Sequence, residues 1–313
     1  MTEAGLIAAR FAHYVALSLA FGAFAYGAFA DVGAPDGVAR RLRLLALWSS
    51  LGVFLAAGLV LFTTVAGLAG GYSATADGAL WTAVVAETDF GRVWIARLLL
   101  AVALSVVAGL ALRRPPASVR PLGMALAGGL LATVALTGHA QIEEGAAGLL
   151  HKAADAIHLL AAGAWIGALP PLLLLLRTPA PGQAVERPEA AARQLQAFHA
   201  VGLTAVLLLV ATGLINSWFL VGGVDRLFDT PYGGVLLVKL ALFAAMLALA
   251  ADNRLRLVPT LARELSQGID AARVLGRLRE NVRGELTLAL LVLLAVAILG
   301  VIAPAQDAAH AGG

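Results

Sequence analysis

The chain has 313 residues, of which 60% are hydrophobic and 13% are charged, with a mean hydropathy of +0.88 and no cysteine. Soluble proteins are about 45–50% apolar and about 25% charged, so the composition excludes an ordinary soluble enzyme. Disorder needs the opposite bias. The absence of cysteine excludes a disulfide scaffold, an iron–sulfur protein and thiolate sites for zinc or copper.

Apolar stretches run through the whole chain. A helix needs about 20 mostly apolar residues to cross a bilayer, and eight stretches meet this length. The sequence therefore predicts an all-α fold, a polytopic membrane bundle of eight transmembrane helices. In chain order the predicted spans are 5–30, 44–68, 92–112, 121–140, 151–176, 198–221, 234–257 and 285–304.

The loops between these spans differ in charge. Loops after odd-numbered spans hold 16 of the 22 Lys and Arg residues, whereas the other loops carry mainly Asp and Glu. Because positive loops stay in the cytoplasm, we expect both termini to be periplasmic. The net charge of +3 and the pI of about 9.7 therefore reflect topology and do not indicate nucleic-acid binding.

One cytoplasmic segment has a helical pattern of its own. Over 261–279, apolar residues recur at helical spacing among Arg and Glu. This pattern is typical of an amphipathic helix that lies on the membrane interface. We expect such a helix on the cytoplasmic lipid surface.

Two pairs of segments resemble each other within the chain. ARFAHYVALSLAFGA (9–23) aligns without gaps with ADAIHLLAAGAWIGA (154–168). TDFGRVWIARL (88–98) matches TPYGGVLLVKL (230–240) in its Thr, aromatic, Gly, Val, cation and Leu positions. The offsets of 145 and 142 residues indicate a single duplication event.

We therefore predict a 4 + 4 parallel duplication, with halves 1–145 and 146–313 integrated into one membrane domain. The alignment matches His13 with His158. If the halves are related by an axis along the membrane normal, these two histidines are equivalent and are expected to face one another near it.

Histidines in the spans are the main candidate functional residues, because ionisable side chains are costly in a membrane. At about 1.5 Å per residue, His13 and His158 lie deeper in the outer half than His139 and His151. We expect two histidine layers there. His199 lies near the cytoplasmic end of its span, where an interfacial or packing role is favoured.

Carboxylates accompany this histidine cluster. The spacing of His151, Asp155 and His158 places all three on one helix face. A carboxylate beside imidazoles commonly fixes the tautomer of a ligating histidine. Glu143 and Glu144 lie in the loop before His151 and are further candidate ligands or supporting residues.

Imidazole suits copper, zinc, iron and nickel. Two opposed imidazoles can hold Cu(I), and three or four with a carboxylate can hold Cu(II). Pro170 and Pro171 are expected to interrupt the fifth span below His158, as happens near binding cavities in transporters. The pattern thus predicts a metal site on the outer side.

The same histidines permit a different cofactor. Two opposed histidines on separate helices also hold b-type haem through axial imidazoles. Arg97, Lys239 and Arg10 would then face the propionates. A bis-histidine haem-binding electron carrier is therefore the alternative.

Five segments of the chain have a distinctive pattern: TGHA (137–140), HKAADAIHLLAAGAWIGAL (151–169), TPYGGVLLVKLAL (230–242), DNRLRLVP (252–259) and RENVRGELTLALLVLLAVAILGVIAP (279–304). The signature His-x-x-Ala-Asp-x-x-His-x-x-x-x-x-x-Trp-x-Gly in the second segment is the most specific part. In these segments the chain resembles the CopD family of copper-resistance membrane proteins.

The resemblance implies a bacterial inner-membrane protein that moves copper from periplasm to cytoplasm beside a periplasmic copper-binding partner of the CopC type. The matching positions are His13, His139, His151, Asp155 and His158. A copper transporter is thus the leading hypothesis, and a non-transporting receptor for a copper chaperone is a third. No nucleophile–base–acid arrangement has supporting spacing, so we do not expect an enzyme.

Overall fold

The computed structural model describes residues 2–30, 36–113, 116–137, 145–176 and 188–308. Within these ranges every regular element is helical, which confirms the all-α prediction. The long helices are α1 (Thr2–Ala30), α2 (Asp36–Leu68), α4 (Asp89–Leu110), α5 (Pro116–Val134), α6 (Gly145–Leu175), α7 (Pro188–Val221), α9 (Pro231–Asp252) and α11 (Ala272–Leu299). The short ones are η1 (Tyr72–Ala76), α3 (Gly78–Trp81), η2 (Thr82–Ala86), α8 (Arg226–Asp229), η4 (Asn253–Leu257), α10 (Val258–Ser266) and α12 (Ala305–Ala308).

Seven helices in the described ranges are long and apolar enough to cross a membrane. The predicted span 121–140 corresponds to α5, whose apolar part, Ser118–Val134, is shorter than the others. The helix gives way to a turn at 135–137. An eighth crossing therefore stays a prediction.

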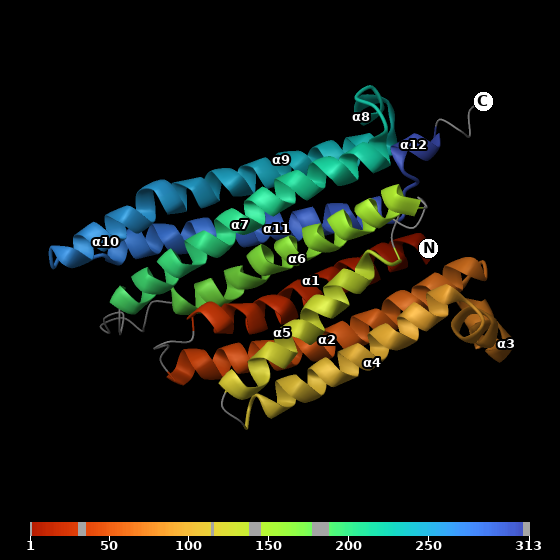
Figure 1. Ribbon diagram of the computed structural model, residues 1–313, viewed down its shortest axis with the longest axis horizontal. Helices are drawn as coiled ribbons and strands as arrows, with labels where there is room; N and C mark the ends of the chain where they lie inside the picture. The colour runs from red at the N-terminus through yellow and green to blue at the C-terminus, as the bar shows by residue number, and fades with distance from the viewer. Residues whose placement is uncertain (1, 31–35, 114–115, 138–144, 177–187, 309–313) are drawn as a thin grey trace.

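Helix α1 lies in the middle of the bundle, as Figure 1 shows. It packs against α2 and α5 on one side and against α6 and α11 on the other. One buried apolar core lies among α1, α2, α4 and α5, and another is centred on α6, α7, α9, α10 and α11. The two groups of helices follow one another in chain order.

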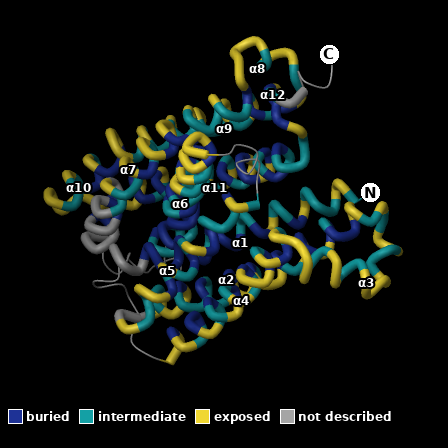
Figure 2. Tube along the Cα trace, turned by 45° about the vertical axis from the view of Figure 1, so that its right-hand side comes forward, coloured by how far each residue is buried: buried dark blue, intermediate teal, exposed yellow. Residues whose placement is uncertain are grey.

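Large apolar side chains lie exposed on the outside of the bundle. Trp48, Leu55 and Trp218 are examples, each more than half exposed. Exposed residues follow the outward faces of α7, α9 and α4 in Figure 2. Such an apolar exterior suits a lipid environment, since soluble monomers rarely expose large continuous apolar surfaces.

The close crossing of α1 and α6 depends on two glycines. A Cβ atom on Gly22 or on Gly167 would collide with the backbone of the other helix. His13 and His158 each precede their glycine by nine residues, which at about 100° per residue is two and a half turns, so each histidine lies half a turn around its helix from the glycine. Both histidines therefore lie on the helix faces opposite this crossing.

The predicted interruption of the fifth span is wrong. Helix α6 continues through Pro170 and Pro171 without a break. Prolines are tolerated within membrane helices because neighbouring groups and small local adjustments satisfy the freed backbone carbonyls. The glycines of this span serve packing instead, since Gly163 abuts Leu131 of α5 and Gly167 abuts α1.

The predicted amphipathic helix 261–279 is divided into two pieces. Gly268 adopts a left-handed conformation with φ of +67° just after α10, a common way to end a helix. The chain resumes as α11 at Ala272. Leu261, Leu275 and Leu278 are buried in the bundle core, so this apolar face packs on protein.

The bundle has two chemically different ends, which lie at opposite sides of Figure 1. The histidine end is defined by the starts of α1, α6 and α9 and contains His151. The arginine end is defined by η4 and α10 and contains Arg254, Arg256 and Arg263.

Candidate metal site

His151 and Asp155 lie one turn apart near the start of α6. The His151 side chain is only 1% exposed and stacks on Phe219 of α7, with ring centroids 4.7 Å apart and planes at 10°. Asp155 accepts a hydrogen bond from Nδ2 of Asn216 at 3.3 Å. The carboxylate also interacts electrostatically with His151 and with Lys239 of α9. The structure thus places His151 and Asp155, two of the three residues predicted to share one helix face, next to each other.

Side chains from several helices lie near the Asp155 carboxylate. Tyr14 of α1 and Tyr232 of α9 lie within electrostatic range of its carboxylate. Arg10 interacts with Tyr14 and donates a hydrogen bond to the Gly300 carbonyl near the end of α11. The carboxylate therefore occupies a polar region that joins the two helix groups.

His158 is anchored by a hydroxyl on α7. Its Nδ1 lies 2.9 Å from Oγ1 of Thr212. That hydroxyl donates its single proton to the Leu208 carbonyl at 2.5 Å, so Nδ1 must be the donor toward Thr212. The neutral ring then carries its lone pair on Nε2, and the Leu209 backbone also lies close to the ring. Lys239 lies within electrostatic range of the ring.

His13 is buried without a polar anchor. Its side chain is 2% exposed, and neither Nδ1 nor Nε2 has a hydrogen-bond partner in the described part of the chain. The Val53 backbone is near the ring but outside hydrogen-bonding geometry. The ring tilts against Trp94 of α4 at a centroid distance of 6.2 Å, and the indole Nε1 is likewise unpaired.

A buried cation lies beside this histidine. Arg97 is 2% exposed, and its guanidinium carbon lies 4.3 Å from the centre of the Trp94 ring. It donates to the hydroxyl and carbonyl of Thr133 at 3.1 and 2.7 Å and to the Thr137 hydroxyl at 3.1 Å. Arg97 also interacts electrostatically with His13. Each deep histidine thus has a cation beside it.

The structure does not bring His13 and His158 together. The neighbours of His13 lie on α2 and α4, whereas those of His158 lie on α7 and α9. Among the described residues, no group of three or more His, Asp or Glu side chains is close enough to hold a metal ion. His139, Glu143 and Glu144 lie outside the described residues.

The sequence did not indicate several polar side chains that contact the candidate site residues. Thr212, Asn216 and Thr133 are single polar residues in apolar spans, and nothing in the sequence states which neighbouring helix each one faces. Glu285 is 3% exposed within α11 and accepts hydrogen bonds from Trp165 and Asn253. Because Glu285 is the first residue of the predicted span 285–304 and follows Glu280 and Arg283, the sequence did not distinguish it from the charged residues of the preceding loop.

Comparison with known families gives two matches. Residues 1–149 match the family described as copper resistance protein D-like, N-terminal domain. Residues 192–299 match the family described as copper resistance protein D. Together the two matched regions cover most of the chain. No solved structure matches the chain significantly.

Three curated relatives are similar over long stretches. Copper resistance protein D of Pseudomonas syringae pv. tomato is 34% identical over 308 residues, which cover 96% of this chain and 97% of the relative. Inner membrane protein YebZ of Escherichia coli is 32% identical over 265 residues, covering 82% and 86%. Copper transport protein CutJ of Bacillus subtilis is 34% identical over 258 residues, covering 79% of this chain and 46% of that longer protein.

Proposed function

Because the chain belongs to the copper resistance protein D family, we propose that it transports copper from the periplasm toward the cytoplasm through its buried histidines. It is a multi-pass membrane protein of a copper-handling family. We place it in the bacterial inner membrane, with the histidine end in the periplasm.

This proposal rests on the ring nitrogens of the two deep imidazoles that can offer a lone pair to a metal ion. His13 has both ring nitrogens unpaired among the described residues, and the donation from Nδ1 of His158 toward Thr212 leaves the lone pair of that ring on Nε2. A buried polar atom without a partner costs about 1–3 kcal/mol. Uncommitted imidazole nitrogen is also the donor that copper accepts in a chain without cysteine.

Asp155 supplies the negative charge that a copper site needs. Its carboxylate interacts with His151, whose ring is held by the Phe219 stack. We propose that copper first contacts this pair. His139, Glu143 and Glu144, which precede α6 in the chain, are proposed as additional ligands at the periplasmic surface.

The neighbouring cations suit a site that releases its ion. Arg97 lies near His13 and Lys239 near His158, so each repels a copper ion bound there. Asp155 offsets part of this repulsion. A conducting site must bind its ion weakly enough for the ion to leave, and this balance of charges favours brief occupancy of either oxidation state, Cu(I) or Cu(II).

The paired arrangement also supports the duplication. His13 with Arg97 and His158 with Lys239 occupy matching places in the two aligned segments. We propose eight crossings in two parallel halves, with both termini in the periplasm. A periplasmic copper-binding protein of the CopC type is the proposed partner at the histidine end, and no enzymatic step is proposed.

Copper binding by the purified protein tests the site. We expect the purified protein to bind copper near-stoichiometrically in a titration carried to saturation, and we expect a large loss of this binding in the double variant His13→Ala with His158→Ala. His199→Ala, a matched histidine change on α7, is expected to retain copper. Unchanged binding in the double variant contradicts the proposed site. A haem absorption band in the purified protein favours the haem-binding electron carrier over the copper transporter.

A further inference from the structure

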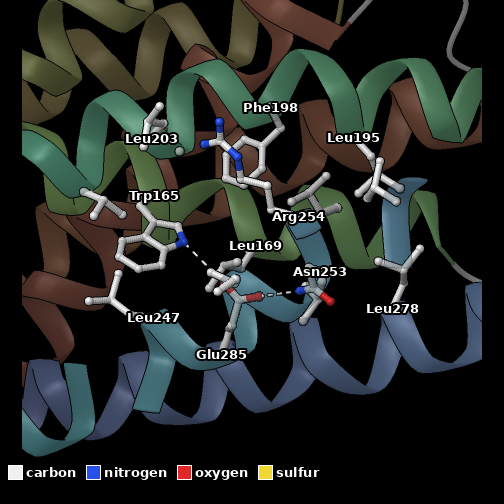
Figure 3. A pocket seen from close by; sticks show the side chains of 17 residues that line it. Trp165, Leu169, Leu195, Phe198, Leu203, Leu247, Asn253, Arg254, Leu278 and Glu285 are labelled. Atoms are coloured by element: carbon white, nitrogen blue, oxygen red, sulfur yellow. Dashed lines mark hydrogen bonds between the residues drawn. The ribbon is translucent and has the colours of Figure 1, made fainter. Parts of the chain in front are cut away.

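Glu285 is a buried acid outside the proposed copper site. It lies on α11 with 3% of its surface exposed, in the half of the bundle next to the arginine end. Oε1 accepts a hydrogen bond from Nδ2 of Asn253 at 2.7 Å, and Oε2 accepts one from Nε1 of Trp165 at 3.3 Å. Figure 3 shows both contacts. Within the described ranges no Lys or Arg forms an ion pair with it.

A cavity of about 190 Å³ lies beside this carboxyl. Its walls come from α6, α7, α9, η4 and α11 and are almost entirely apolar, with Phe198, Leu203, Leu247 and Leu278 among the side chains drawn in Figure 3. An ionised carboxylate facing such walls is strongly disfavoured unless it is paired. Two neutral donors compensate it only in part, so a bound proton stabilises the group.

A chain of hydrogen bonds leads from Glu285 to the surface. Asn253 accepts from Nδ2 of Asn281 at 3.0 Å, and the same amide donates to Oδ2 of Asp252 at 3.0 Å. Oδ1 of Asp252 pairs with Arg256 at 3.6 Å, and the Arg256 side chain is 82% exposed. The chain thus joins the buried acid to the arginine end.

The chain of hydrogen bonds begins at an irregular turn of the backbone. Residues Asn253–Leu257 form the π-helical turn η4 between α9 and α10. Such turns are rare and frequently mark functional sites. Here the turn begins at Asn253, the residue that bonds Glu285 directly.

The charged groups around Glu285 are few. From η4, Arg254 lines the same cavity, and Asp252 is connected through Asn281. The α6 wall presents Trp165, and the α7 wall presents apolar side chains such as Leu195 and Phe198. Apart from its arginine-end connection, the acid is therefore enclosed by apolar groups and neutral donors.

We propose that Glu285 is a proton-binding site that exchanges its proton with the arginine end of the bundle through the cavity, which the exposed Arg254 lines, while Asn253, Asn281 and Asp252 hold its carboxyl in place. The cation distribution predicts that this end is cytoplasmic. The proposal goes beyond copper handling and needs no copper. Trp165 lies on the α6 face that also carries His151 and His158, so a proton at Glu285 is placed to act on the same helix as the copper site.

Labelling with dicyclohexylcarbodiimide tests the proposal, because this apolar reagent reacts with protonated carboxyls. The full chain is reconstituted in liposomes in one orientation, without copper, and the pH is varied on each side separately. We expect an adduct on Glu285 whose yield falls as the pH at the arginine end rises. The pH at the histidine end is expected to have no effect on this yield. Absence of the adduct at every pH overturns the proposal, and so does an adduct whose yield follows the pH at the histidine end.

Two variants sharpen the result. Glu280→Gln changes an exposed acid on the same helix and is expected to leave the adduct unchanged. Asn253→Leu removes the 2.7 Å hydrogen bond to the carboxylate, so the ionised form is stabilised less and the adduct is expected to persist to higher pH at the arginine end. An unaltered pH dependence in Asn253→Leu contradicts the assignment of the titrating group to Glu285. Because no copper is present, failure of this test and failure of the copper proposal are distinguishable.

Discussion

Nδ1 of His158 lies 2.9 Å from the hydroxyl of Thr212, whose own proton is given to the Leu208 carbonyl. This relationship between α6 and α7 selects the tautomer of the imidazole and leaves Nε2 as the nitrogen with the lone pair. A threonine that looks like an ordinary helix residue therefore determines which nitrogen of His158 carries the lone pair.

Thr212→Val keeps the shape of the side chain and removes the acceptor. We expect copper affinity to fall by about 10-fold to 100-fold, the usual effect of losing a group that orients a ligating histidine. Copper titration of the purified protein measures it. Thr204→Val, an exposed threonine on the same helix, is the control and is expected to bind like the parent. Equal affinity in both variants would show that the tautomer does not matter.

Asp155→Asn is expected to weaken copper binding and to lower the thermal stability. The change leaves the charge of Lys239 without its carboxylate, and an uncompensated buried charge is destabilising. Adding Lys239→Met is expected to restore most of the stability but not the copper affinity. The melting temperatures of the two single variants and the double variant measure this coupling. Strictly additive losses contradict it.

Arg97→Gln is expected to change copper binding in the opposite direction. Removing the cation beside His13 removes its repulsion of a bound copper ion, so copper is expected to bind more tightly and to leave more slowly. Arg92→Gln changes an exposed arginine paired with Asp89 on the same helix and is the control. Weaker binding in Arg97→Gln contradicts the assigned role of this cation.

Gly167→Ala is expected to destabilise the bundle by about 1–3 kcal/mol or more. The added methyl group meets the backbone of α1 near Gly22, which cannot move aside as a side chain does. Gly58→Ala places its methyl group in open space and is expected to be neutral or slightly stabilising. Thermal unfolding in detergent compares the two. Similar melting temperatures would contradict the close crossing.

The positions of the long helices were predictable from the sequence, because each needs only a run of apolar residues. Their lateral neighbours were not. The expectation that His13 and His158 face one another used depth and symmetry but not helix rotation. Gly22 and Gly167 decide the rotation, since they bring α1 and α6 together and turn both histidines to the opposite faces.

Local interruptions were also hard to predict. Two consecutive prolines argued for a break in α6, yet the helix continues through them. A helical apolar pattern argued for one helix over 261–279, yet Gly268 ends α10 there. In α6 the packing of apolar side chains such as Leu172 outweighs the local proline signal, whereas after α10 the left-handed Gly268 is itself the local signal that ends the helix.

Copper flux into proteoliposomes is the most direct test of the central claim. Isotopic copper is supplied at the histidine end of the reconstituted full chain, and copper inside the vesicles is followed over time. We predict uptake above that of empty vesicles and its loss in the double variant His13→Ala with His158→Ala. Protein that binds copper but carries none across the membrane contradicts transport and identifies a receptor instead.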